Sequence, residues 1–566
     1  MLNPQILKKV NEWKETKIPS YLEEELSKMN EEELNDAFYK DLEFGTGGMR
    51  GVIGPGTNRM NIYTLRKANY GYACFLKDTG KKNLSVVIAY DCRHMSLDFA
   101  KESARVLAYL GIKCYLFPRI TPTPLLSFSV RYLKATGGIV VTASHNPPKY
   151  NGYKIYDSDG CQLVPDLANI VINYVEKAPD PLYMEMPTFQ EFEEKKMIMW
   201  LNDDVDRAYL EKVKSISVKD VNKENFKVVF TPLHGTSQFL GPILLTEMGY
   251  SFVTVKEQMV ADPNFSTLVL PNPEDKRAFD LAIKYAKEND ADICIATDPD
   301  ADRVGLAVRD NDGNYVLLTG NQTGALLINY LAQNRKVDKQ GVIFNTVVTN
   351  PLGVIIGKKY NLEYFSTLTG FKFIGEQAKL LENSKDKMFY FGYEESYGYV
   401  IKDFVRDKDS LQALLMCSEM ACFYKNQGLT LLDVLEGLYK EFGYYLDALE
   451  NFVLEGESGA LRINRILDRF RKESLPEGVF EIESKEDYLL HEKINYLTNE
   501  KSILALPTSN VIKYNLKDGG FFVLRPSGTE PKMKLYISEV GKTREIALEK
   551  IKYIKENVIK IIEEVK

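Results

Sequence analysis

The sequence predicts an α/β protein with three similar α/β domains, whose sheets are mixed and largely parallel, and a smaller α+β domain at the C-terminal end. Three observations carry this prediction. Apolar runs of strand character alternate with helical stretches, which is typical of largely parallel sheets. This alternation stops after about residue 445. A chain of 566 residues is also too long for one hydrophobic core.

Six apolar runs are each followed by a polar loop. In chain order they are Val86–Ala89, Ile139–Val141, Lys227–Phe230, Asp292–Ala296, Gly341–Phe344 and Met388–Phe391. We expect each run to be a buried strand, with the loop at its carboxyl end, where α/β proteins hold their ligands. At the other end of the chain, Arg544–Val565 has apolar residues at helical spacing and predicts an amphipathic helix that faces a core.

These blocks divide the chain into four expected domains. The charged stretch Phe189–Lys196 and the region Asp203–Leu210 precede the second block, and the turn Asn334–Gln340 separates the second block from the third. The expected domains cover residues 1–210, 211–333, 334–445 and 446–566.

Composition is that of an ordinary globular protein, with 45% hydrophobic and 27% charged residues. A net charge of −7 argues against nucleic acid or a membrane surface as a partner. No stretch reaches the roughly 20 apolar residues of a membrane-spanning helix, and the first residues lack the apolar core of a signal peptide. The seven cysteines form no C-x-x-C pair and are odd in number, which fits a reducing compartment. We therefore expect a cytoplasmic protein.

Ser144 lies in a polar loop directly after the apolar run Ile139–Val141, where an α/β scaffold usually places a nucleophile. No G-x-S-x-G elbow surrounds it, so an esterase-type triad is not indicated. His145 is adjacent, but neighbouring loop residues often point apart, so the sequence does not establish a Ser–His pair. Seen alone, the segment also fits a plain polar loop that ends at Pro147 and Pro148.

A second loop carries three carboxylates on alternate positions, Asp298, Asp300 and Asp302, followed by Arg303. Such a turn can aim its oxygens at one hard cation. An EF-hand is rejected, because an apolar strand precedes the loop and Arg303 occupies the position of the required glycine. An aspartate nucleophile of a phosphatase and a solvated acidic turn are the alternatives, although three crowded carboxylates repel one another without a cation.

Two further loops suit a phosphorylated sugar. Arg525, Ser527, Gly528 and Thr529 offer a guanidinium fork, two hydroxyls and a small residue that lets an anion approach. Glu394 and Ser396 lie between glycines and suit the hydroxyls of a sugar. Each loop alone fits an ordinary hairpin turn equally well.

Two other segments are less specific on their own. The glycine-rich segment that contains Arg50 lacks both the Gly-Lys-Ser/Thr ending of a P-loop and the setting of a dinucleotide fingerprint, which makes an NTPase or a dehydrogenase a poor interpretation. Lys372 follows a turn, and most such lysines are solvated. The four histidines have no zinc-ligand spacing.

Taken in order, TASHNPPKYNGYK, TDPDADR, GYEESYG and RPSGTEPK resemble the motifs of the α-D-phosphohexomutase family, most closely those of its long, phosphoglucomutase-type members. The resemblance covers nearly the whole chain, with one motif in each expected domain. It implies three related α/β domains and a C-terminal domain around a central cleft. Tyr393, where the family usually has glycine, and Ser410, after Asp409, depart from the pattern and bear on sugar preference more than on chemistry.

The resemblance also implies roles for individual residues. Ser144 matches the serine that is phosphorylated in the active enzyme, and its phosphate joins Asp298, Asp300 and Asp302 as ligands of Mg²⁺. Arg303 is then expected near the phosphate. His145 and Lys154 match active-site positions, Lys372 matches a proposed proton-transfer lysine, and Arg50 matches the family's amino-terminal arginine. Glu394 and Ser396 match readers of sugar hydroxyls, and the site for the substrate's non-reacting phosphate matches Arg525, Ser527, Gly528 and Thr529.

The activity implied is the interconversion of glucose 1-phosphate and glucose 6-phosphate through a phosphoserine, with glucose 1,6-bisphosphate as intermediate and activating primer. Activity on mannose or pentose phosphates, an aspartate-nucleophile phosphatase and a silent sugar-phosphate-binding protein are the alternatives. The expected partner is a phosphorylated sugar, with no nucleic acid and no membrane, and the expected assembly is a monomer or a dimer.

Overall fold

The computed structural model describes residues 2–45, 48–454, 456–473, 475–476, 478–526 and 532–566. They form two compact units, which are described separately. The first comprises Met1–Gly320, Val337–Lys339 and Phe371–Thr430, and the second comprises Asn321–Lys336, Gln340–Gly370 and Leu431–Lys566. Within the described residues, no helix has the length and apolar character needed to cross a membrane.

The first unit begins with three short helices, α1 (Pro4–Glu15), α2 (Ser20–Lys28) and α3 (Glu31–Phe38). Asn3 caps α1 and Asn30 forms a capping box on α3, so free backbone N–H groups at both helix starts are satisfied. Apolar side chains from the three helices bury one another around Trp13 and form a small core of their own.

A six-stranded sheet follows, in the order β1-β5-β4-β2-β3-β6. Strands β2, β3, β4 and β6 pair in parallel, while β5 runs antiparallel to both β4 and β1. The strands are β1 (Gly48–Val52), β2 (Ser85–Tyr90), β3 (Lys113–Leu116), β4 (Gly137–Val141), β5 (Tyr150–Tyr156) and β6 (Ile198–Trp200). The accompanying helices are α4 (Ile62–Asp78), α5 (Ser96–Tyr109), α6 (Thr123–Tyr132), α7 (Pro165–Val175) and α8 (Phe189–Glu194), with a 3-10 turn at Pro181–Tyr183.

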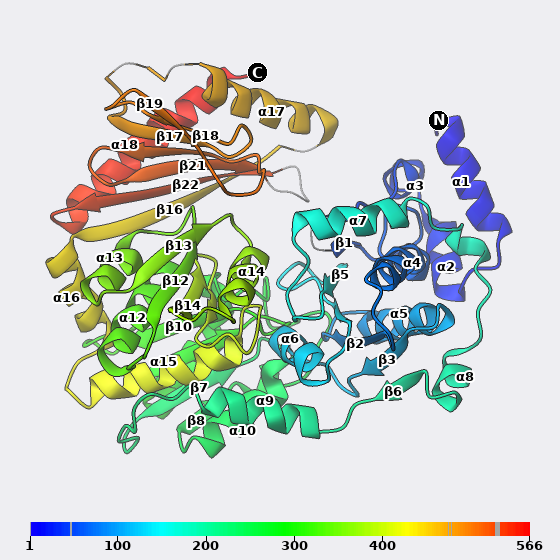
Figure 1. Cartoon of the computed structure of the whole chain (residues 1–566), viewed down its shortest axis with the longest axis horizontal. Helices are drawn as coiled ribbons and strands as arrows, with labels where there is room; N and C mark the ends of the chain where they lie inside the picture. The colour runs from blue at the N-terminus through cyan, green and yellow to red at the C-terminus, as the bar shows by residue number, and fades with distance from the viewer. Residues whose placement is uncertain (1, 46–47, 455, 474, 477, 527–531) are drawn as a thin grey trace. The chain divides into compact units, whose positions relative to one another are not determined.

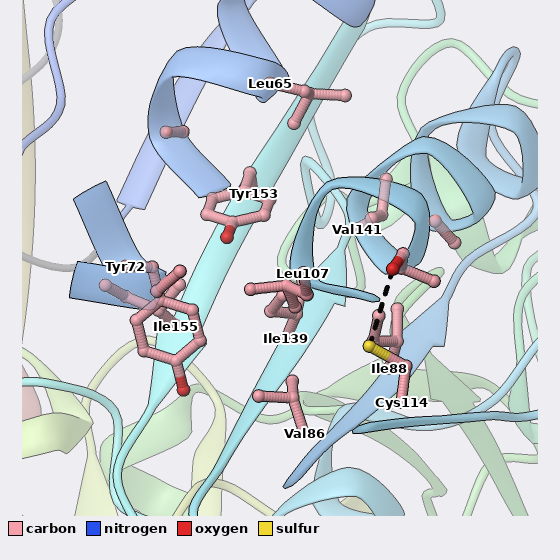
Figure 2. Close-up of a cluster of buried hydrophobic side chains, with 14 of the residues drawn as sticks. Leu65, Tyr72, Val86, Ile88, Leu107, Cys114, Ile139, Val141, Tyr153 and Ile155 are labelled. Carbon is pink, nitrogen blue, oxygen red and sulfur yellow. Dashed lines mark hydrogen bonds between the residues drawn. The ribbon is translucent and has the colours of Figure 1, made fainter. Parts of the chain in front are cut away.

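The sheet is buried between its helices. Figure 2 shows Val86 and Ile88 of β2, Ile139 and Val141 of β4, and Ile155 of β5 meeting in one core. All five residues are completely buried, as expected for central strands that are covered on both faces. This rigid core fixes the ends of β2 and β4, from which two loops of the site emerge.

The next sheet has five strands in the order β11-β10-β9-β7-β8. Strand β7 is parallel to β8 and β9, and β10 is antiparallel to β9 and β11. The strands are β7 (Lys227–Thr231), β8 (Ser251–Thr254), β9 (Ile293–Thr297), β10 (Val304–Arg309) and β11 (Tyr315–Leu317). The helices are α9 (Asp204–Lys214), α10 (Ser237–Glu247) and α11 (Asp280–Asn289), with 3-10 turns at Lys256–Gln258 and Lys276–Phe279.

The first unit also contains α14 (Phe371–Leu381), the antiparallel pair β14 (Lys387–Glu394) and β15 (Gly398–Val400), and α15 (Ser410–Lys425). Strand β14 runs on to Glu394, so the first half of the GYEESYG segment is strand and only Glu395–Tyr397 form the turn. Pairing with β15 extends the strand beyond the apolar run that predicted it.

In the second unit, β12 (Gln340–Thr346) and β13 (Glu363–Thr367) pair in parallel. A seven-stranded sheet, antiparallel throughout, has the order β16-β22-β21-β20-β17-β18-β19. Helices α17 and α18 pack on this sheet (Figure 1). Its strands are β16 (Tyr444–Val453), β17 (Ile482–Asp487), β18 (Glu492–Asn495), β19 (Glu500–Ile503), β20 (Ile512–Leu516), β21 (Phe521–Pro526) and β22 (Lys532–Gly541). The helices of the unit are α12 (Gly320–Asn334), α13 (Leu352–Lys359), α16 (Leu431–Phe442), α17 (Gly456–Lys472) and α18 (Arg544–Glu564).

The expected fold class is confirmed. The six predicted apolar runs are β2, β4, β7, β9, β12 and β14, and the predicted C-terminal helix is α18. Three α/β regions with mixed sheets precede a region with an antiparallel sheet.

Candidate active site

Ser144 follows β4 and takes a left-handed backbone conformation, with φ of +51°. A serine adopts this conformation only where its surroundings hold it. Here the backbone N–H of Ser144 donates to Oγ1 of Thr142 at 2.8 Å. The residue is 3% exposed, so its hydroxyl lies inside the protein and reaches a small set of partners.

The Ser144 hydroxyl donates to Oδ2 of Asp298 at 2.6 Å. Nδ1 of His145 lies 3.1 Å from the same Oγ, so the two neighbouring side chains do converge. Burial, together with the positive charges of Arg303 and Arg50, lowers the pKa of His145 well below its usual value. The imidazole is therefore neutral at pH 7, and Ser144 lies between a carboxylate and an uncharged ring.

Three buried aspartates cluster in the loop after β9. Asp298, Asp300 and Asp302 each offer a carboxylate oxygen, and these oxygens lie within 4.8 Å of one another. The loop turns back on itself because the backbone N–H groups of Asp302 and Arg303 both donate to Oδ1 of Asp298. Thr123, at the start of α6, holds Asp300 through two hydrogen bonds, one from its hydroxyl at 3.0 Å and one from its backbone N–H at 2.9 Å.

Two lysines partly neutralise this cluster. Nζ of Lys154 lies 2.9 Å from Asp300 and 3.4 Å from Asp302. Nζ of Lys408 lies 3.0 Å from Asp302 and 3.3 Å from Asp407. Lys154 is part of strand β5, so its backbone is fixed by the sheet and not by the serine loop.

Two of the three aspartates have pKa values shifted in opposite directions. Burial and the charges of Asp300 and Asp302 raise the pKa of Asp298 well above its usual value. Burial alone raises the pKa of Asp302 as well, but Lys408 and Lys154 outweigh it and leave this pKa below its usual value. Mutual repulsion and burial therefore weigh most on Asp298, which has no lysine partner, while Lys154 and Lys408 lie against the other two aspartates.

The arrangement fits a divalent cation. Oδ1 of Asp300 and Oδ1 of Asp302 are buried and have no hydrogen-bond partner among the described residues. Buried carboxylate oxygens without a partner are costly, and a hard cation satisfies them. The donor set is all oxygen, as Mg²⁺ prefers.

Two arginines surround the serine loop. Arg303 pairs with Glu274 through Nη1, and its backbone forms an isolated bridge with Gly398, which joins the aspartate loop to β15. Arg50, on β1, donates from Nη1 to Oδ1 of Asn146 at 2.9 Å. Both guanidinium groups therefore come from outside the loop that carries Ser144.

Glu394 and Ser396, in the segment that we call the sugar loop, lie in the same unit as Ser144. Glu394 ends β14 and is 4% exposed. Its charge adds to the larger effects of Glu274 and Asp302, which raise the pKa of Arg303, and to that of Asp302, which raises the pKa of Lys408. Ser396 is half-buried in the turn between β14 and β15. Lys372 lies in the first turn of α14, with its amine 5.3 Å from the ring centroid of Phe373.

Of the four residues expected to bind the phosphate that does not react, the structure describes only Arg525. Arg525 belongs to β21, in the second unit, and donates from Nη1 to the hydroxyl of Tyr536 at 3.3 Å. Ser527, Gly528 and Thr529 lie outside the described residues.

Sequence reasoning missed four residues that the site uses: Arg93, Thr123, Glu274 and Lys408. Arg93 lies two residues after the buried Asp91, in the loop that follows β2, and Lys408 directly follows the buried Asp407. An aspartate followed closely by a basic residue is the sequence pattern that could have identified Arg93 and Lys408. Thr123 and Glu274 contact the aspartate loop across long sequence distances and carry no local signature.

Family models match the three parts of the chain that carry these loops. The model "Phosphoglucomutase/phosphomannomutase, alpha/beta/alpha domain I" covers residues 41–181, and the models for domains II and III cover residues 207–313 and 319–442. The three models occur in order and contain the serine loop, the aspartate loop and the sugar loop, respectively.

Relatives extend the match to most of the chain. A phosphoglucomutase from Staphylococcus epidermidis is 38% identical over 530 residues, which is 93% of this chain and 96% of the relative. One from Staphylococcus aureus is 40% identical over 509 residues, 89% of this chain and 91% of the relative.

Solved structures share the fold. The phosphoprotein pp63/parafusin from Paramecium, in its open form, has a TM-score of 0.69 at 18% identity and covers 93% of this chain and 96% of its own. A phosphoglucomutase/phosphomannomutase family protein from Burkholderia thailandensis has a TM-score of 0.67 at 19% identity, with 92% and 97% covered. The chain belongs to the phosphoglucomutase/phosphomannomutase family and is a phosphohexomutase.

Proposed function

We propose that this protein is a phosphoglucomutase, which interconverts glucose 1-phosphate and glucose 6-phosphate. Ser144 carries the phosphoryl group, and glucose 1,6-bisphosphate is the intermediate and the activating primer. One observation carries the proposal: the Ser144 hydroxyl donates to Asp298, within a buried triad of carboxylates suited to a cation. Relatives named phosphoglucomutase that are 38–40% identical favour glucose over other sugars.

The reaction consists of two opposite transfers. In the first, a free hydroxyl of the sugar monophosphate forms a bond to the phosphorus of phosphorylated Ser144, the bond to Oγ breaks, and the hydroxyl proton passes to the site. In the second, Oγ of Ser144 takes the other phosphoryl group from the bisphosphate and a proton returns to the sugar. Phosphoryl transfer requires mainly positioning and charge stabilisation, which this site supplies.

Mg²⁺ fits the site through Asp298, Asp300 and Asp302, together with an oxygen of the Ser144 phosphate. Bound there, it neutralises charge on the phosphoryl group and polarises the phosphorus. Oδ1 of Asp300 and Oδ1 of Asp302, which have no hydrogen-bond partner among the described residues, support this assignment.

The remaining residues bind and orient the substrate. Lys154 and Arg303 place positive charge around the triad, and Arg50 approaches the serine loop through Asn146. His145 lies against Oγ of Ser144. We propose that Glu394 and Ser396 bind sugar hydroxyls, that Lys372 takes part in proton transfer, and that Arg525, with Ser527, Gly528 and Thr529, binds the phosphate that does not react.

We further propose the four-domain division at residues 1–210, 211–333, 334–445 and 446–566 and a cytoplasmic location. The change from mixed sheets to an antiparallel sheet at β16 supports the last boundary. Seven free cysteines support a reducing compartment.

The test combines intact-protein mass with a coupled rate assay. After incubation with glucose 1,6-bisphosphate and Mg²⁺, the wild type gains one phosphate, which Ser144→Ala does not. Ser129→Ala is the matched control, because Ser129 is equally buried in the same unit and only donates to a helix carbonyl.

Rates are then compared for the 1-phosphates of glucose, mannose, ribose and deoxyribose. The proposal expects glucose 1-phosphate to have the highest kcat/KM and Ser144→Ala to lose at least about 10⁴-fold. Net release of inorganic phosphate that survives Ser144→Ala contradicts it and favours an aspartate-nucleophile phosphatase. A higher kcat/KM for mannose 1-phosphate contradicts the sugar assignment alone.

A further inference from the structure

Arg93 is buried directly behind the serine loop. It lies in the loop that follows β2, is 3% exposed, and pairs with Asp91 through Nε at 3.3 Å. Both side chains of this pair are completely buried. The face of its guanidinium also packs over the ring of Phe265, at 5.0 Å from the ring centroid.

The guanidinium gathers four backbone carbonyls of one short segment. Nη1 donates to the carbonyls of Pro147 and Tyr150, at 2.9 and 3.1 Å. Nη2 donates to the carbonyl of Ser144 at 2.5 Å and also to that of Asn146. Every one of these acceptors lies within residues 144–150, so a single planar group holds the serine loop at four points of its backbone.

This path places Ser144 in its unusual conformation. Ser144 has a left-handed backbone, which a serine adopts less readily than a glycine, and in this conformation its Oγ donates to Asp298. The carbonyl of Ser144 itself is one of the acceptors of Arg93, so the guanidinium acts at the strained residue.

We propose that Arg93 is a positioning residue for phosphoryl transfer: it holds the serine loop in the conformation that aims Oγ of Ser144 at the aspartate triad. The inference rests on the proposed role of Ser144 as phosphoryl carrier. Among the described residues, Arg93 donates its hydrogen bonds to the loop backbone and none to the triad or to Oγ, while its charge also interacts with Asp298 and Asp300. Lysine cannot replace it, because an ammonium group lacks the planar fork that reaches several carbonyls at once.

The test compares Arg93→Lys with Arg66→Lys. Arg66 is a matched control, since it is also buried in the first unit, pairs with Glu102 and donates to the carbonyl of Pro181. We expect Arg93→Lys to lower kcat about 100-fold while KM for the sugar phosphate changes less than about threefold, because misplacement of the reacting group costs transfer and not binding. Arg66→Lys leaves both constants near those of the wild type.

A second readout follows the transfer itself. Ser144 is first phosphorylated with glucose 1,6-bisphosphate, and loss of this phosphate to glucose 1-phosphate is followed by rapid quench and intact mass. We expect the single-turnover rate of Arg93→Lys to fall by the same factor as kcat. A merely structural role would lower the amount of active enzyme and leave the rate of the active fraction unchanged, which contradicts the proposal.

A milder variant keeps the inference testable if Arg93→Lys does not fold. Asp91→Asn preserves shape but removes the carboxylate that orients Arg93, and we expect it to lower the single-turnover rate about tenfold. Equal losses of the single-turnover rate in Asp91→Asn and Arg66→Lys overturn the inference. If wild-type Ser144 never becomes phosphorylated, the proposed function fails first, and this result is distinct from a failure of Arg93.

Discussion

The Oγ of Ser144 and the Oδ2 of Asp298 lie 2.6 Å apart, although 154 residues separate them in the chain. The contact joins the loop after β4 to the loop after β9, at the ends of strands in two different sheets. It brings the proposed phosphoryl carrier to the proposed cation ligands within one compact unit.

Asp300→Asn is expected to abolish stabilisation by Mg²⁺. The wild type should gain about 3 kcal/mol when Mg²⁺ is present at 100 times its dissociation constant, because a ligand that binds only the folded state stabilises it. The variant replaces the carboxylate that carries Oδ1 of Asp300, one of two buried oxygens that have no hydrogen-bond partner among the described residues and that suit a cation. Thermal unfolding with EDTA or Mg²⁺ measures the difference.

The control for this variant is Asp290→Asn. Asp290 has an 82% exposed side chain and pairs with Arg309, away from the triad. The Asp290→Asn variant should gain as much thermal stability from Mg²⁺, relative to EDTA, as the wild type does. An unchanged shift in Asp300→Asn as well would place the cation elsewhere.

Lys408→Met is expected to destabilise the protein more in EDTA than in Mg²⁺. Lys408 is the closest cation to Asp302, whose side chain is 2% exposed, and removing one partner of a buried ion pair costs about 3 kcal/mol. A bound divalent cation compensates the carboxylate, so the cost should be smaller when Mg²⁺ is present. Differential scanning calorimetry in both buffers checks this expectation.

Lys425→Met serves as its control, because Lys425 pairs with Asp292 at a more exposed position. An exposed pair contributes little, so its small effect should be the same in both buffers. If Lys408→Met also has the same cost in both buffers, Lys408 and the cation do not share Asp302.

Gly235→Ala is expected to displace the aspartate loop. A Cβ at Gly235 would lie 2.5 Å from Cα and 2.6 Å from the carbonyl oxygen of Pro299, between two triad residues. Backbone atoms cannot move aside as a flexible side chain can, so we expect a loss of about 2 kcal/mol in stability and of about 100-fold in kcat. Steady-state kinetics with thermal unfolding measures both.

The comparison variant is Gly437→Ala in α16, where a Cβ meets nothing within 4 Å. It should be neutral or slightly stabilising, because alanine favours a helix over glycine. Similar behaviour of the two alanine variants would argue against close packing beneath the aspartate loop.

Glu539→Gln is expected to change how the stability of the C-terminal sheet depends on pH. Glu539 is 1% exposed on β22, and burial together with the charge of Asp518 raises its pKa from 4.5 to about 7, against the opposing charge of Lys550. The folded carboxyl therefore keeps a proton that the unfolded one releases between about pH 4.5 and pH 7. Stability falls as pH rises through this window, by up to about 3 kcal/mol, and Glu539→Gln removes that fall.

Hydrogen exchange measured by mass spectrometry can localise this effect. At pH 7 the amides of β22 should exchange more slowly in Glu539→Gln than in the wild type, and at pH 5 the two should agree. Strand β2 of the first unit provides the internal control and should not differ at either pH. Equal exchange of β22 in both proteins at pH 7 would mean that Glu539 is not protonated in the folded state.

Local patterns predicted much of the fold. The strands β2, β4, β7, β9, β12 and β14 were visible because a buried parallel strand needs a continuous apolar run. The short strand β15 has no such run and was missed, because it exists only through its pairing with β14. In the same way, no apolar run predicted β5, which carries Lys154 and is fixed by pairing with two neighbours.

The sequence by itself determined which chemistry this protein carries. Ser144 and the three aspartates lie in polar loops that directly follow apolar runs, and this pattern can be recognised from the local sequence alone. Only the tertiary structure decided how these groups meet. It turned His145 toward Ser144, placed Lys408 against Asp302, and put Arg93 behind the serine loop. Those contacts depend on hydrogen bonds and charges between segments far apart in the chain, which no local pattern records.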